Sequence, residues 1–74
     1  MAFEKPTDVQ LENRYCYHAP KGDQTDRYAA IRKQCLELAK FIRDNTPCSP
    51  DQSLALTALD DVMFRANAAI ARNE

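Results

Sequence analysis

The sequence has few of the features that stabilise a small protein. Among its 74 residues it has one glycine, one histidine, no tryptophan and only three cysteines. A chain this short buries only about 60% of the surface that its unfolded form exposes, so it usually needs disulfides, a metal or partner subunits. An odd number of cysteines with no apolar leader ahead of them favours free thiols, and His18 without a Cys-x-x-Cys pair argues against structural zinc. We therefore expect stability to come from partner subunits.

The charge balance excludes several classes of partner. The net charge is −1, and duplex DNA-binding proteins usually carry a clear excess or stripe of positive charge. A small anion needs only a few local cations, so it stays a candidate ligand. No apolar run approaches the length of a membrane span. We expect neither DNA nor a membrane as a partner.

Two segments, one near the beginning of the chain and one near its middle, contain residues typical of the start of a helix. Pro6-Thr7-Asp8 predicts a short helix capped by Thr7 and running to about Arg14. In the middle of the chain, Ser49-Pro50-Asp51-Gln52 combines a cap, a proline suited to the first helical position and a capping box completed by Gln52. The latter signal is the strongest in the sequence, and the helix that it starts is expected to run to about Ala71.

Apolar residues recur at helical spacing in two long segments. After an irregular connection through Pro20 and Gly22, Thr25 or Asp26 can cap a first long helix that runs to about Asn45. The predicted seams, spaced alternately by three and four residues, are Tyr28, Ile31, Cys35, Leu38 and Ile42 in the first helix and Leu56, Leu59, Met63, Ala66 and Ile70 in the second.

These elements predict an all-α fold in a single domain, residues 1–74. It comprises an N-terminal arm with a short helix (1–24), a first long helix (25–45) and a second long helix (49–72), the last two forming an antiparallel hairpin. The second long helix carries a wider apolar arc than one facing helix can cover. We therefore expect a homo-oligomer.

Three segments contain candidate ligand-binding residues. Residues 13–18, followed by Lys21, mix aromatic rings that stack on bases with cations that neutralise phosphate. Composition alone favours a plainer role, in which Tyr15 and Tyr17 anchor the arm on the hairpin. Arg27 and Arg32 could reach a phosphate, or could pair with the nearby Asp23 and Asp26. Arg72, near the end of the chain, could simply complement the dipole of the second long helix.

The sequence contains no recognisable pattern of catalytic residues. His18 has no nucleophile and orienting group spaced around it in a recognisable pattern, and there is no glycine-rich phosphate loop. We therefore expect no enzyme activity and no cofactor.

The order of several short segments resembles one known family. These segments are 13–18, Lys21, 27–32, 36–39, 53–57 and the closing Ala-Asn-Ala-Ala-Ile-Ala-Arg-Asn run of 66–73. Together they resemble the phage anti-CBASS sponges of the Acb2/Tad1 hairpin type over about residues 11–74. The closing run and the Tyr-x-Tyr-His stretch are the most specific parts of the likeness.

The resemblance implies a small helical hairpin that assembles into a hexamer. Such proteins bind cyclic dinucleotides such as 3′,3′-cyclic GMP–AMP between protomers, and some bind cyclic trinucleotides at a separate site. They hold the messenger without degrading it, in the cytoplasm of the infected bacterial host, and so keep the CBASS effector inactive. The residues that match are Tyr17 for stacking on a base, His18 beside it, Lys21, Arg32 or Lys33 for a phosphate, and Arg72 with Asn73 for the trinucleotide site. Cys16 replaces a threonine-like residue and is expected to face away from the ligand.

A second interpretation needs no ligand. The same hairpin could be an interaction module whose excess apolar face docks a host or phage protein. The aromatic and basic residues of the arm distinguish the two hypotheses, because a docking module has no need of them.

Overall fold

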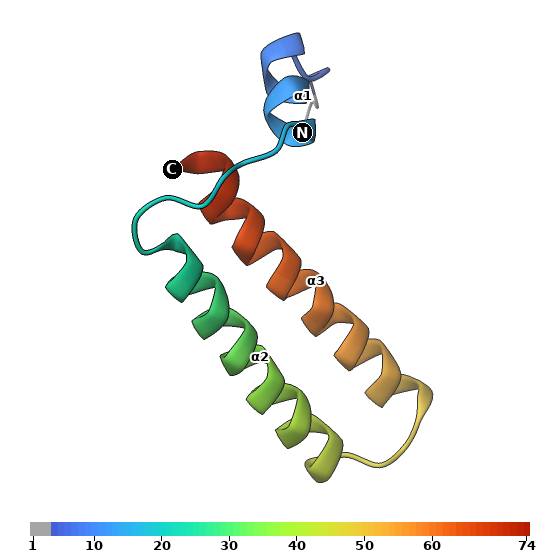
Figure 1. Ribbon diagram of the computed structural model, residues 1–74. Coiled ribbons are helices and arrows are strands. Elements are labelled where there is room, and N and C mark those ends of the chain that lie inside the picture. Colours follow the sequence, from blue (N-terminus) through green and yellow to red (C-terminus); the bar gives the residue numbers. More distant parts are fainter. Residues whose placement is uncertain (1–3) are drawn as a thin grey trace.

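The computed structural model describes residues 4–74, and this part of the chain is all helical. It contains α1 (Asp8–Tyr15), α2 (Gln24–Asn45) and α3 (Pro50–Asn73), with no strand in the range described. The helices α2 and α3 pack side by side as an antiparallel hairpin, while α1 lies apart from them, beyond the end of α3 (Figure 1). The predicted all-α hairpin preceded by a short helix is therefore confirmed. We call residues 4–23 the arm.

The start of α1 is as the sequence predicts. The Gln10 N–H donates to Thr7 Oγ1 at 3.1 Å, and the Thr7 N–H donates to Gln10 Oε1 at 2.9 Å. This reciprocal pair is a capping box that satisfies two amides which the helix itself leaves unpaired. The helix ends at Tyr15, one residue beyond the predicted Arg14.

The predicted cap of α2 is wrong. The helix begins at Gln24 with Asp23 in the cap position, ahead of both Thr25 and Asp26. A turn at Gly22, which has a φ of 54°, lets the Gln24 N–H donate to Lys21 O and the Lys21 N–H donate to Gln24 Oε1, both at 3.0 Å. This turn provides the helix start, while the Asp23 carboxylate pairs with Arg27 and caps no amide.

The start of α3 confirms Ser49 as the cap and Pro50 as the first helical residue. The Gln52 N–H donates to Ser49 Oγ at 3.1 Å. The Gln52 side chain does not complete a capping box, contrary to expectation. Its Nε2 donates to Arg43 O, Thr46 O and Thr46 Oγ1 at 3.0–3.2 Å, so it ties the start of α3 to the end of α2. The helix extends to Asn73, beyond the predicted limit near Ala71.

Replacing Ser49 tests the cap that starts α3. We expect Ser49→Ala to lower the free energy of unfolding by about 1 kcal/mol, because the Gln52 amide loses its acceptor. Chemical denaturation followed by circular dichroism measures this change. Ser53→Ala, within the same helix, is the control and should have a smaller effect. Equal effects of the two substitutions would show that Ser49 contributes no cap.

The seam between α2 and α3 is only partly covered. All five predicted seam residues of α3 are half-buried, as are four of the five in α2. The exception is Leu38, which is 47% exposed while Ala39 is half-buried instead. In residues 4–74 no apolar side chain is buried, and the one buried residue is Gln24, at 3% exposure.

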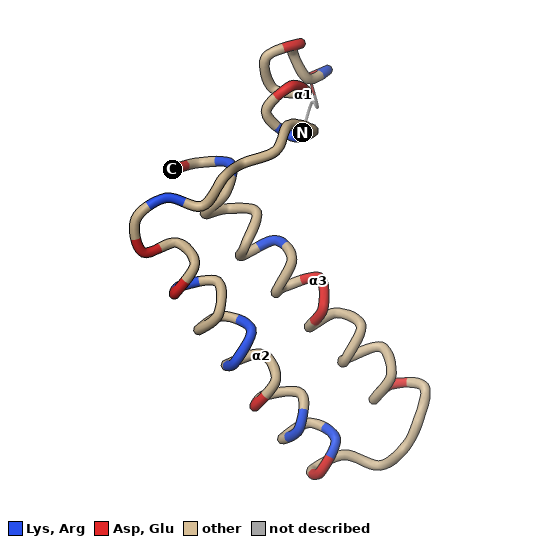
Figure 2. Tube along the Cα trace, in the orientation of Figure 1, with Lys and Arg blue, Asp and Glu red and all other residues tan. Residues whose placement is uncertain are grey.

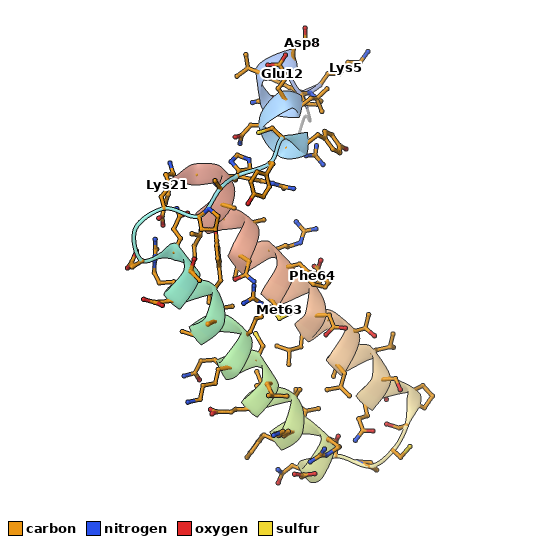
Figure 3. All side chains as sticks on the ribbon, in the orientation of Figure 1. Lys5, Asp8, Glu12, Lys21, Met63 and Phe64 are labelled. Atoms are coloured by element: carbon orange, nitrogen blue, oxygen red, sulfur yellow. The ribbon has the colours of Figure 1, made fainter. Side chains whose placement is uncertain are left out.

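Much apolar surface therefore faces outwards. Met63 lies in the seam, whereas its neighbour Phe64 is 63% exposed (Figure 3). The accessible surface of the chain is 6258 Å², whereas a compact monomer of this mass exposes about 4600 Å². The large exposed apolar residues of the long helices are Leu36, Leu38, Phe41, Leu54, Val62 and Phe64. No helix within residues 4–74 is both long and apolar enough to cross a membrane.

Candidate functional site

A groove of about 350 Å³ lies where the arm crosses the open end of the hairpin. Three separate segments line it: the arm, the first turns of α2 and the last turns of α3. The lining residues are Arg14, Cys16, Tyr17 and His18 from the arm, Tyr28 and Arg32 from α2, and Asn67, Ala68, Ala71 and Arg72 from α3.

The groove is a concentration of positive charge beside an open aromatic ring. Its lining contains three arginines and no aspartate or glutamate, in a chain whose net charge is −1. Elsewhere on α2 and α3 both basic and acidic residues occur, and the first half of α3 carries only acidic ones (Figure 2). No ion pair within residues 4–74 involves Arg14, Arg32 or Arg72, so these guanidinium groups can meet an anionic ligand. The Tyr17 side chain is 86% exposed, which leaves its ring open to stacking.

Hydrogen bonds attach the arm to the end of α3. Asn13 Nδ2 donates to Arg72 O at 3.1 Å, and Arg72 Nη2 donates to Arg14 O at 3.3 Å. Within the arm, His18 Nε2 lies 2.7 Å from Asn13 O. These bonds hold the segment after α1 against the end of α3, where Tyr17, His18 and Arg72 share the lining of the groove.

Cys16 and His18 come together around one shared acceptor. Cys16 Sγ lies 3.5 Å from His18 Nε2, and both groups bond the main-chain oxygen of Asn13. A carbonyl oxygen only accepts, so His18 Nε2 is the donor in its bond to Asn13 O. Cys16, which the sequence led us to expect on the side away from a ligand, is among the residues that line the groove.

The structure brings four of the predicted site residues together and leaves three elsewhere. Tyr17, His18, Arg32 and Arg72 line the groove. Lys33 is exposed on α2 and lies outside the lining, because one residue along a helix turns the side chain by about 100°. Asn73 lines a separate hollow of about 210 Å³ with Arg65, Ala68, Ala69 and Arg72. Lys21 lies at the end of α3, on the side of Glu74 (Figure 3).

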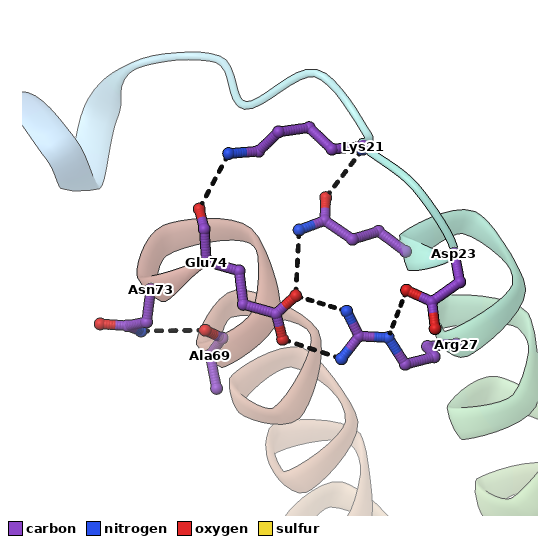
Figure 4. Close-up of polar contacts among 7 residues, drawn as sticks. Lys21, Asp23, Arg27, Ala69, Asn73 and Glu74 are labelled. Carbon is purple, nitrogen blue, oxygen red and sulfur yellow. Dashed lines mark hydrogen bonds and ion pairs between the residues drawn. The ribbon is translucent and has the colours of Figure 1, made fainter.

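Arg27 pairs with carboxylates, which was one of the two roles that the sequence left open. Its guanidinium donates through Nη1 and Nη2 to both carboxylate oxygens of Glu74, and its Nε lies 3.2 Å from Asp23 Oδ1 (Figure 4). The bond from Arg27, followed by one from Gln24, lowers the pKa of Glu74 to about 2. The bond to Glu74, together with the charge of Asp23, raises the pKa of Arg27.

The lowered pKa of Glu74 gives a pH dependence with a definite sign. A carboxylate whose pKa falls on folding stabilises the folded state above its ordinary value of 4.5, and loses that contribution as the pH falls towards 2. We expect Glu74→Gln to destabilise the protein at pH 7 and to have little effect near pH 2. Melting temperatures of both proteins between pH 2 and 8 measure this, and a difference independent of pH would contradict it.

Sequence reasoning missed part of the lining. Tyr28 was assigned to the seam, and Asn67 received no role, although its Oδ1 is buried without a hydrogen-bond partner among residues 4–74. Helical spacing could have indicated Tyr28 and Ala68, which lie four residues before Arg32 and Arg72. No cluster of histidine, cysteine, aspartate and glutamate in the described range could hold a metal ion.

A comparison with known protein families gives a match, which covers nearly the whole hairpin. The sequence profile described as "Acb2/Tad1, hairpin domain" matches residues 7–71, which include α1, α2 and nearly all of α3. Neither curated proteins nor solved structures provide a match. The profile match extends over far more than half of the sequence and agrees with the helical architecture. The chain therefore belongs to the Acb2/Tad1 hairpin-domain family, and this membership indicates an anti-defence role.

Proposed function

We propose that this protein is a sponge that binds cyclic dinucleotide messengers in the groove and withholds them from a CBASS effector. The observation that carries the proposal is the lining of the groove, where an open tyrosine ring lies beside three arginines with no carboxylate. A cyclic dinucleotide such as 3′,3′-cyclic GMP–AMP presents two bases for stacking and two phosphates for the arginines. Membership of the Acb2/Tad1 hairpin-domain family supports the same conclusion.

Each predicted residue except Lys33 has a place in this proposal. Tyr17 stacks on a base with His18 at its edge, and Arg32, rather than Lys33, meets a phosphate. Arg72 and Asn73 serve a cyclic trinucleotide at the adjacent hollow. Lys21 contributes indirectly, because its ammonium group is already bonded to the main-chain oxygen of Glu74.

The proposal includes a homo-oligomer, with the hexamer that the family resemblance implies. Two properties of the single chain support assembly. Its long helices expose large apolar residues, and its groove of about 350 Å³ is near the lower limit of small-molecule sites, about 300–1000 Å³. A second protomer would cover apolar surface and close the groove. Light scattering measures the mass in solution, and a monomer would contradict this part of the proposal.

Binding without catalysis is the second part of the proposal. Cys16 and His18 share one acceptor, and His18 Nε2 is protonated towards it, so the groove offers a messenger no activated nucleophile. A sponge acts by lowering the concentration of free messenger, in the cytoplasm of the infected bacterium where the effector is activated.

A time course of sequestration tests the proposal. An effector nuclease activated by 3′,3′-cyclic GMP–AMP is assayed after incubation of the messenger with increasing protein. We expect inhibition to rise in proportion to protein and to be independent of incubation time. After proteolysis of the sponge, the released messenger should activate the nuclease fully. Inhibition that grows with time and survives proteolysis would indicate degradation instead.

The alternative is an interaction module that docks another protein through its exposed apolar surface. The observation in its favour is the exposure of Phe41, Val62 and Phe64 at 57–65%. Such a module would not change the amount of free messenger. The same assay therefore separates the two functions, since a docking module would leave activation of the nuclease unchanged.

A further inference from the structure

The last turn of α3 is the attachment point between distant parts of the chain. Within residues 4–74, each hydrogen bond between residues 47 to 59 positions apart involves Arg72 or Glu74. All other hydrogen bonds of side chains within residues 4–74 join residues at most nine positions apart. Arg72 connects to the arm near Asn13, as described for the groove, whereas Glu74 connects to the other end of the arm.

Glu74 organises a cluster that consists of Lys21, Asp23, Gln24, Arg27 and Glu74 itself. Its carboxylate accepts two bonds from Arg27 and one, at 3.3 Å, from Gln24 Nε2, and its main-chain oxygen accepts one from Lys21 Nζ at 3.0 Å (Figure 4). Gln24 in turn bonds the Lys21 backbone through its Oε1 and is the one buried residue in the described range. The cluster therefore connects α3, α2 and the junction at which the arm leaves α2.

The arm has little else to hold it in place. Its helix α1 has eight residues, too few to be stable in isolation, and it lies apart from the hairpin (Figure 1). Tyr17, which is 86% exposed, gains no fixed position from packing. Tyr17 and His18 lie between the two attachments, Asn13 to Arg72 on one side and Lys21 to Glu74 on the other.

We propose that Arg27 and Glu74 are positioning residues for messenger binding, which hold the junction of the arm so that Tyr17 and His18 stay at the groove. This inference rests on the proposed function and extends it to residues outside the groove. Neither residue lines the groove, and the guanidinium group of Arg27 is already paired with the carboxylates of Asp23 and Glu74. Loss of the pair lowers the fraction of protein molecules in which the arm is in place. The apparent affinity falls in proportion, because only those molecules can bind.

Two measurements on the intact protein test this proposal. Hydrogen exchange without ligand reports the arm, and calorimetric titration with 3′,3′-cyclic GMP–AMP reports binding. We expect Glu74→Gln and Arg27→Gln each to accelerate exchange in residues 13–24 and to weaken binding roughly tenfold. Because both substitutions break one pair, the double variant should bind no more weakly than either single variant. Exchange in the middle of α2 and α3, and the oligomeric mass, should not change.

Asp44→Asn is the matched control. It removes one carboxylate and one exposed ion pair, Asp44 with Arg43, at the opposite end of the hairpin, and should change neither readout. Unchanged exchange of the arm in Glu74→Gln would overturn the proposal, as would unchanged binding or additive losses in the double variant. Failure of the unsubstituted protein to bind would instead refute the proposed function, and the exchange data would still report whether Glu74 holds the arm.

Discussion

Tyr17→Ala is expected to abolish most messenger binding while the protein keeps its oligomeric mass. Stacking of a base on an aromatic side chain contributes roughly 1–3 kcal/mol, so affinity should fall roughly 5- to 150-fold. The fold should survive, because the Tyr17 side chain is 86% exposed and covers no apolar seam. Titration calorimetry with 3′,3′-cyclic GMP–AMP, together with light scattering, measures both properties.

Two variants of the same arm make this result specific. Tyr17→Phe keeps the ring and should bind nearly as tightly as the unsubstituted protein. Tyr15→Ala removes a ring that is 80% exposed but lies outside the lining of the groove, and it should have a much smaller effect. Equal losses in Tyr15→Ala and Tyr17→Ala would mean that the tyrosines hold the arm in general, and the stacking role would be wrong.

Arg32→Ala is expected to weaken binding roughly 10- to 150-fold. A hydrogen bond to a charged group contributes roughly 1.5–3 kcal/mol, and Arg32 has no ion-pair partner among residues 4–74 that competes with a phosphate. The loss should be larger at low ionic strength, because salt screens the attraction in the unsubstituted protein. Titrations at two salt concentrations measure both effects.

Lys33→Ala is the control for Arg32→Ala, since it removes the same charge from the next position of α2. Lys33 lies outside the lining of the groove, so its loss should change affinity only slightly. An equal loss in the two variants would indicate that α2 attracts the messenger through its overall charge, without a direct contact from Arg32.

Local chemistry explains which parts of the fold could be predicted. Thr7 and Ser49 are caps whose partners lie three residues away, so short sequence windows contain the whole interaction. The predicted cap of α2 was wrong because the start of this helix depends on the turn at Gly22. The partners of Asp23 and Arg27 depend in turn on Glu74, which lies far away in the sequence. Leu38 was placed in the seam by its spacing, but the actual crossing of α2 and α3 brings Ala39 there instead.

The candidate site was harder to predict because three segments build it. The sequence offered Tyr17, His18, Arg32 and Arg72 as candidates, but not that the arm crosses the end of α3 so that all four line one groove. That arrangement depends on bonds such as Asn13 to Arg72, which connect residues 59 positions apart. Spacing alone also could not choose between Arg32 and Lys33, which differ only in the side of α2 that each occupies.

Calorimetric titration of the unsubstituted protein with 3′,3′-cyclic GMP–AMP, followed by chromatography of the recovered ligand, tests the central claim most directly. We expect tight binding at about one ligand per two chains, the ratio for a site that two protomers share symmetrically, and recovery of intact messenger. No binding of this ligand or of a cyclic trinucleotide would contradict the sponge and favour the protein-interaction module.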